Sequence, residues 1–115
     1  MSKKIGEKGE QIAYEYFLAN DYQIVAQNYR YKRGEIDLIV EKDNLLVFVE
    51  VKLRKNIRFG QPENTISPKQ QKLILSAAEN YVFENNWTNN IRFDILAIVG
   101  KDDKYEVMHL EDVFI

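Results

Sequence analysis

Residues 34–54 constrain the fold more than any other stretch of this chain. Their first half alternates carboxylate and aliphatic side chains, their second half is rich in Val and Leu, and Asp43-Asn44 lies between the halves. Asp and Asn tolerate the positive φ angles of a two-residue turn, so the stretch is predicted to be a β-hairpin. With Asp43 and Asn44 as the central turn residues, Asp37 faces Glu50.

The same register gathers polar side chains on one face of the hairpin. Glu35 faces Lys52, and strand periodicity places both on the face of Asp37 and Glu50. Directly opposed residues have Cβ atoms about 4.5–5.5 Å apart, so the two carboxylates repel each other. A divalent cation would offset the repulsion, because Mg²⁺ binds oxygen ligands and is commonly held by one or two carboxylates. The ammonium of Lys52 can position a water molecule or stabilise charge that develops on a phosphate.

The arrangement Asp37, twelve residues, Glu50-Val51-Lys52 resembles the catalytic signature of the PD-(D/E)xK, or restriction-endonuclease-like, phosphodiesterases. Other short stretches resemble the YraN-like uncharacterised proteins, which are distant relatives of archaeal Holliday-junction resolvases. These stretches are Gly6-Glu7-Lys8-Gly9-Glu10, Gly34-Glu35-Ile36-Asp37, Phe48-Val49-Glu50-Val51-Lys52, Phe59-Gly60 and Arg92-Phe93-Asp94. The resemblance covers nearly the whole chain. One departure is that Ile36, not Pro, precedes Asp37.

The resemblance implies a metal-dependent endonuclease that cleaves phosphodiester bonds of DNA, including branched or repair intermediates, with Mg²⁺ or Mn²⁺ as the cofactor. It implies that the catalytic residues are Asp37, Glu50 and Lys52. The implied metal ligands are Asp37, Glu50, the backbone carbonyl of Val51, and Glu10. On helical periodicity alone Glu10 is a carboxylate beside the buried face of a helix, paired with a basic neighbour. Relatives carry an acidic residue on this helix that completes the metal site.

Basic side chains are concentrated between residues 30 and 72, although the whole chain has a net charge of −2. Ten basic residues stand against six acidic ones in that segment, a difference of +4. Local patches of this kind make phosphate contacts, so the overall charge does not exclude a nucleic-acid partner. The residues predicted to contact nucleic acid are Arg30, Arg33, Arg54, Lys55, Lys69 and Lys72.

The rest of the chain predicts helices at about residues 5–20 and 67–85, and strands at about 22–31, 91–99 and 105–110. Tyr22, Ile24 and Ala26 are expected on one face of the first strand. Ser67 is the expected N-cap of the second helix, with Gln70 able to complete a capping box. The order α-β-β-β-α-β-β favours an α/β sandwich with a mixed central sheet, in one domain of residues 1–115. The resemblance implies the restriction-endonuclease-like form of this fold, an α/β/α sandwich.

Composition favours a cytoplasmic protein that does not enter membranes, because cysteine, an apolar leader and a long apolar run are all missing from the sequence. His109, the only histidine, has no partner pattern and is expected to be structural.

Two alternatives to a DNA nuclease stay open. In the first, the chain is a non-catalytic module that binds nucleic acid or protein, with a charged ladder formed by Glu35, Asp37, Glu50, Lys52 and Arg54. In the second, the nuclease acts on RNA. A homodimer through an apolar patch at Phe59 or Phe114 is also expected.

Overall fold

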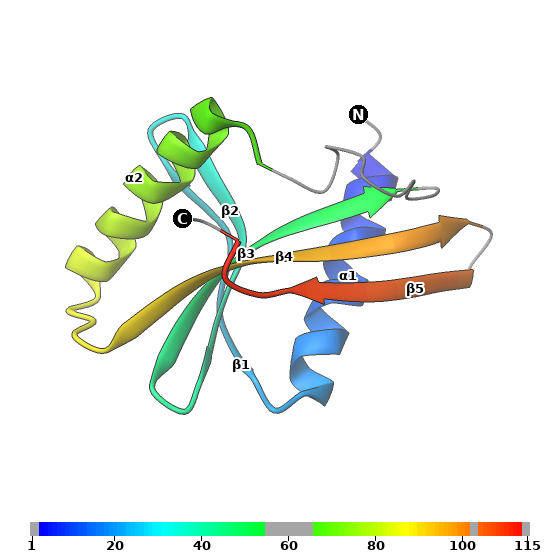
Figure 1. Cartoon of the computed structure of the whole chain (residues 1–115), viewed down its shortest axis with the longest axis horizontal. Coiled ribbons are helices and arrows are strands. Elements are labelled where there is room, and N and C mark those ends of the chain that lie inside the picture. The colour runs from blue at the N-terminus through cyan, green and yellow to red at the C-terminus, as the bar shows by residue number, and fades with distance from the viewer. Residues whose placement is uncertain (1–2, 55–65, 102–103, 114–115) are drawn as a thin grey trace.

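The computed structural model describes residues 3–54, 66–101 and 104–113. Its elements follow the predicted order (Figure 1): α1 Lys3–Ala19, β1 Gln23–Tyr31, β2 Gly34–Lys42, β3 Leu45–Arg54, α2 Pro68–Glu84, β4 Asn90–Lys101 and β5 Lys104–Leu110. Residues 55–65, with Lys55 and Phe59, lie outside the described residues, as does Phe114. In the part of the chain that is described, no helix is long and apolar enough to cross a membrane.

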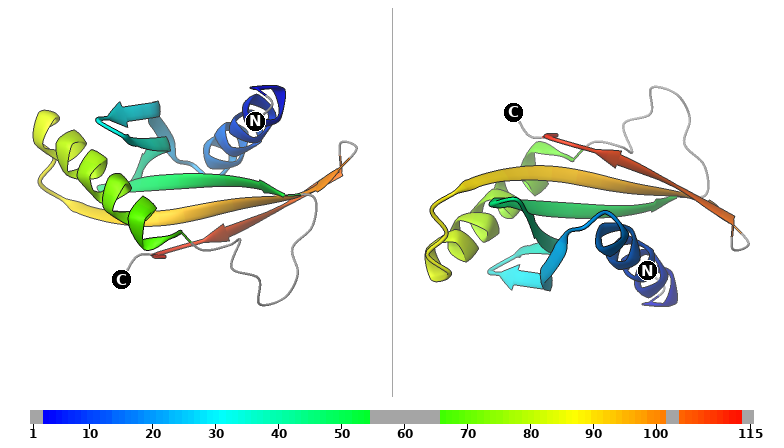
Figure 2. Two further views of the ribbon diagram at one scale, coloured as in Figure 1. Left: turned by 90° about the horizontal axis from the view of Figure 1, so that it is seen from above. Right: turned by 90° about the horizontal axis from the view of Figure 1, so that it is seen from below.

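The five strands form one mixed sheet in chain order. β3 and β4 run parallel, and every other neighbouring pair is antiparallel. Parallel neighbours need a crossover connection, and α2 lies within that connection. Figure 2 shows the β1–β2 hairpin between α1 and α2, and the two helices pack on opposite faces of the twisted sheet, so the predicted α/β/α sandwich is confirmed.

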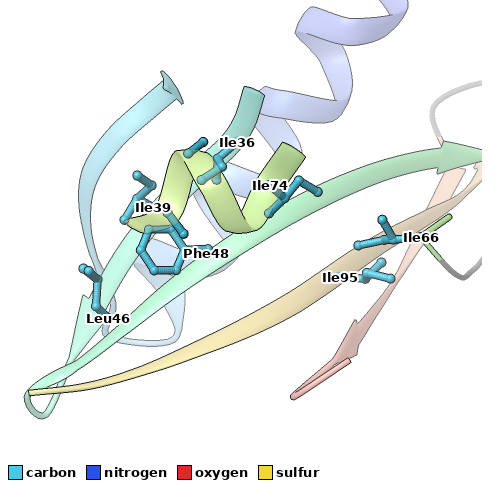
Figure 3. Close-up of a cluster of buried hydrophobic side chains, with 9 residues drawn as sticks. Ile36, Ile39, Leu46, Phe48, Ile66, Ile74 and Ile95 are labelled. Atoms are coloured by element: carbon cyan, nitrogen blue, oxygen red, sulfur yellow. The ribbon is translucent and has the colours of Figure 1, made fainter. Parts of the chain in front are cut away.

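Two clusters of buried side chains hold the layers together, one on each face of the sheet. The α2 face buries Ile36, Ile39, Leu46, Phe48, Ile66, Ile74, Ala77, Ala78 and Ile95 (Figure 3). The α1 face buries Ala13, Phe17, Leu38, Val40, Val47, Val49, Leu96 and Ile98. Strands buried on both faces read as nearly continuous apolar runs, which explains the composition of residues 45–49.

The predicted hairpin forms with the predicted turn. Asp43 and Asn44 have φ angles of 52° and 63°, and Lys42 pairs with Leu45. The predicted side-chain alternation in β1 was wrong, because the register with β2 shifts between Ile24 and Ala26. This irregularity turns Ala26 toward the α2 cluster while Ile24 packs against the α1 cluster.

Helix α2 begins and ends as predicted. The Ser67 hydroxyl accepts a hydrogen bond from the Gln70 backbone N–H at 3.2 Å, and Asn85 is the C-cap. The side chain of Gln70 does not reach back to the cap. It donates from Nε2 to Glu50 on β3, so the first turn of α2 is tied to the sheet.

Gly34 is the point where the β1–β2 hairpin meets α2. A Cβ atom at this position would lie 2.4 Å from the carbonyl oxygen of Leu73, a backbone atom that cannot rotate away. We expect Gly34→Ala to lower the free energy of unfolding by about 1–3 kcal/mol, the usual cost of overpacking. Urea denaturation measures this loss.

Gly9→Ala is the matched control for that substitution. A Cβ atom on Gly9 would meet Leu53 Cβ at 3.6 Å, which is an ordinary contact, and Gly9 lies within α1. Replacing a helical glycine by alanine stabilises by up to about 1 kcal/mol, so the two substitutions should have opposite signs. Equal stability of the two variants would show that the close approach at Gly34 is not a constraint.

Candidate active site

The candidate site lies where β2 and β3 separate. Their regular pairing ends at Leu38 and Val49, one position before the predicted Asp37–Glu50 pair. At this point Asp37 Oδ2 accepts a hydrogen bond of 2.7 Å from the backbone N–H of Val51. The Asp37 carboxylate therefore satisfies a strand N–H group and fixes the peptide between Glu50 and Val51.

The predicted strand pair of Glu35 with Lys52 was wrong. Glu35 is the partner of Arg30 on β1, and its Oε1 lies 3.5 Å from the Arg30 guanidinium. The reason is that this half of β2 pairs only with β1, after β3 has diverged. The continuous charged ladder of the non-catalytic alternative is therefore interrupted at Glu35.

Glu50 lies at the centre of the polar cluster. Its carboxyl group is hydrogen-bonded to the Asp37 carboxyl and accepts a bond from Gln70 Nε2. Burial raises the pKa of Glu50 to about 9, with further upward contributions from the hydrogen bond and charge of Asp37 and from the charge of Glu35. The Lys52 ammonium acts in the opposite direction. The pair of Asp37 and Glu50 thus retains one proton at neutral pH in the metal-free protein.

A small pocket beside Glu50 accounts for its burial. The pocket has a volume of about 10 Å³, which is room for about one water molecule. Its walls are mainly apolar and come from β2, β3, β4, α2 and the segment before α2. They include Ile36, Phe48, Ile66, Ile74 and Phe93, and also the buried Asp94. A carboxylate at this wall loses hydration, so the neutral acid is favoured.

Stability should fall as pH rises, because folded Glu50 retains a proton that the unfolded chain has released. Between the ordinary glutamate pKa and about 9 the native state holds one more proton, so the slope approaches about 1.4 kcal/mol per pH unit from this group. We expect Glu50→Gln to remove this slope and to stabilise the protein at about pH 8. Urea denaturation from about pH 6 to pH 8 measures both effects.

Glu79→Gln is the control for the pH experiment, since Glu79 is an exposed glutamate of α2. It should leave the wild-type slope unchanged. A wild-type stability that is flat with pH, or a Glu50→Gln variant that keeps the wild-type slope, would contradict the buried neutral acid.

The oxygen atoms of this cluster fit a hard cation that takes few protein ligands. Asp37 and Glu50 offer two adjacent carboxyl groups once Glu50 has lost its proton, and the Val51 carbonyl belongs to the same short segment. Mg²⁺ is commonly held by one or two carboxylates, with water and substrate phosphate completing the shell. Among the described residues, no group of three acidic, histidine or cysteine side chains is arranged to bind a metal. Glu10 is half-buried on α1, next to Gly9, and its role as a further ligand stays a prediction.

Among the described residues, the predicted nucleic-acid contacts fall into two groups. Arg30, Arg33, Lys69 and Lys72 are exposed on the β1–β2 hairpin and on the first turns of α2. Arg54 is half-buried at the end of β3, where its guanidinium donates to the Leu53 carbonyl at 3.0 Å.

The comparisons with known proteins agree with the resemblance seen in the sequence. The model of the uncharacterised protein family UPF0102 matches residues 9–98. The chain belongs to this family. A UPF0102 protein of Natranaerobius thermophilus is 43% identical, with 98% of each chain covered. One of Christiangramia forsetii is 37% identical, covering 96% of this chain and 93% of the relative. The wider placement among PD-(D/E)xK nucleases stays a prediction.

The UPF0102 match includes Asp37, Glu50, Lys52 and Gln70, and it also includes Asp94, whose role the sequence did not predict. Asp94 is buried on β4, where Arg92 donates to both carboxylate oxygens at 2.8 Å. His109 Nε2 and the backbone N–H of Asp112 also bind this carboxylate, at 2.7 and 3.1 Å. Burial alone would raise the pKa of Asp94, but these hydrogen bonds outweigh it and lower the pKa.

His109 links this ion pair to α1. Its Nδ1 lies 3.1 Å from the Tyr16 hydroxyl, and its ring packs edge-on against Tyr16 and Phe17. The Asp94 network lies with the α1 cluster, on the other face of the sheet from Glu50. It therefore holds α1, β4, β5 and the segment after β5 together, while Asp94 itself also lines the pocket beside Glu50.

Proposed function

We propose that this protein is a metal-dependent phosphodiesterase that cleaves nucleic acid, with DNA as its substrate. The observation that supports this most is the contact between the carboxyl groups of Asp37 and Glu50, with the Lys52 ammonium close enough to influence Glu50. A purely structural role does not require two acids to share a half-buried site beside an apolar pocket. Such a pair becomes useful when a cation replaces the shared proton.

Each residue then has a distinct task. Asp37 and Glu50 would hold Mg²⁺ or Mn²⁺, which supplies charge for the phosphate and lowers the pKa of a bound water molecule. Lys52 orients the attacking water and stabilises negative charge on the phosphate in the transition state. Gln70 orients the Glu50 carboxyl group, and the Val51 N–H bond keeps Asp37 beside it.

The test is a cleavage assay on a panel of nucleic acids. The purified protein is incubated with linear, nicked, flapped and four-way-junction DNA and with structured RNA, in Mg²⁺, in Mn²⁺ and in EDTA. We expect metal-dependent cleavage of at least one DNA substrate, and loss of cleavage in Asp37→Asn. Cleavage of RNA alone would assign the RNA-directed alternative. No cleavage of any substrate in either metal would count against the proposal.

One observation favours a non-catalytic nucleic-acid or protein-binding module. A protonated Glu50 that bonds to Asp37 and Gln70 is satisfied without a cation. The two functions differ in their response to metal, because a ligand that binds only the native state raises its melting temperature. We expect Mn²⁺ to raise the melting temperature of the wild type but not of Asp37→Asn. A homodimer stays a prediction, since Phe59 and Phe114 lie outside the described residues.

A further inference from the structure

Exposed basic side chains from two distant parts of the sequence gather at one end of the molecule. We call them the hairpin–helix patch: Arg30, Lys32, Arg33, Lys69 and Lys72. The first three lie at the end of the β1–β2 hairpin, and the last two lie on the first turns of α2. All five are exposed, in contrast to the half-buried Lys52 and Arg54.

The contact at Gly34 brings the two parts of the patch together. Gly34 directly follows Arg33, and its backbone lies against the Leu73 carbonyl, one residue after Lys72. Figure 1 shows the end of the β1–β2 hairpin beside the first half of α2. Because this approach leaves no room even for a Cβ atom, it holds together the two backbone segments that carry the patch.

The positive charges of the patch are neutralised by few nearby carboxylates. Glu35 is the carboxylate beside it, 3.5 Å from Arg30, in a pair whose side chains are 76% and 37% exposed. Exposed pairs of this kind contribute little to stability. Within the described part of the chain, the other four basic residues have no ion-pair partner. Further along α2, the next carboxylate after Lys72 is Glu79, about 10 Å away along the helix axis.

The patch also adjoins the candidate active site. Lys69 directly precedes Gln70, whose side chain bonds to Glu50. A phosphate held by the first turn of α2 would gain from the helix dipole as well as from the lysines. A polyanion lying across the hairpin and α2 would therefore pass close to the carboxyl pair.

We propose that the hairpin–helix patch binds the phosphodiester backbone of the nucleic acid on one side of the cleavage point. The nature of this polymer rests on the proposed function. The patch adds Lys32 to the contacts predicted from the sequence. It leaves out Arg54, whose guanidinium donates to the Leu53 carbonyl, and Lys55, which lies outside the described residues. Contacts to phosphate alone give binding that depends strongly on salt and not on base sequence.

The test is the salt dependence of binding, measured in EDTA so that metal-dependent cleavage does not occur. Fluorescence anisotropy with a labelled DNA duplex of arbitrary sequence gives the slope of log K against log salt for the full-length protein. We expect Lys32→Ala, Arg33→Ala, Lys69→Ala and Lys72→Ala each to reduce this slope by roughly 0.9, the value for one lost phosphate contact. Affinity should fall by the same factor on a duplex of different sequence.

Lys104→Ala is the matched control. Lys104 is an exposed lysine at the start of β5, at the end of the molecule opposite α2 (Figure 1). It should keep the wild-type slope. If all four patch variants behave like Lys104→Ala, or if the wild type does not bind the duplex, the assignment of the patch is wrong. Patch-dependent binding without any metal-dependent cleavage would overturn the proposed function and leave the binding surface in place.

Discussion

Replacing Lys52 by alanine is expected to lower the rate of DNA cleavage by orders of magnitude while leaving DNA affinity nearly unchanged. The reason is that Lys52 is placed beside the carboxyl pair, on β3, and is half-buried. An interaction made mainly in the transition state lowers the rate constant when it is lost, without an equal effect on binding. Arg33→Ala should show the reverse, because Arg33 is exposed at the edge of the molecule and is assigned only to phosphate binding.

A pH series separates two ways in which Lys52 can act. Its ammonium lowers the pKa of Glu50, so its removal also makes Glu50 harder to deprotonate for metal binding. A loss that came only from a protonated Glu50 would recover as the pH is raised. A loss of rate caused by the missing ammonium group would persist as the pH is raised. Because the pKa of Glu50 is about 9 in the wild type and higher without Lys52, the series extends above pH 9. We expect the rate of Lys52→Ala to stay low there, and full activity in a preparation free of other nucleases would remove Lys52 from the mechanism.

Local signals were sufficient to predict the elements of the fold and the carboxyl pair. Asp43-Asn44 demands a tight turn, and the turn fixes which residues of β2 and β3 come together. Ser67 and Pro68 define the start of α2 by hydrogen bonding and by backbone geometry within one turn. These predictions succeed because the interactions that decide them span only a few residues.

Interactions between distant segments could not be predicted. The separation of β2 from β3 at Asp37 depends on a side chain that takes the place of a strand partner. Gln70 lies 20 residues after Glu50, and no periodicity in the sequence connects them. His109 was expected to be structural, but its partners Asp94 and Tyr16 come from β4 and α1 and leave no pattern around it. Each contact depends on the packed arrangement of elements, which a single sequence does not encode locally.

The Asp94 network should carry the largest effect on stability in the described part of the protein. We expect Asp94→Ala to lower the free energy of unfolding by about 3–5 kcal/mol, because removing one member of a buried ion pair leaves the other without compensation. The Asp94 side chain is fully buried, and Arg92, His109 and the Asp112 N–H group would all lose their acceptor. The whole free energy of unfolding of a domain of this size is about 5–15 kcal/mol, so the variant should be close to unfolding at 37 °C.

Glu111→Ala is the control for this experiment, since Glu111 pairs with the same arginine at 3.5 Å but is 57% exposed. This substitution should lower the free energy of unfolding by less than about 1 kcal/mol. Urea denaturation measures both variants, and near-ultraviolet circular dichroism reports on Tyr16 and Tyr22, which contact the network. If Asp94→Ala were as stable as Glu111→Ala and still bound Mn²⁺ normally, the network would not be what holds α1 and β5 to the sheet. A destabilised Asp94→Ala variant that retains cleavage at low temperature would show that this carboxylate supports the fold and not the chemistry.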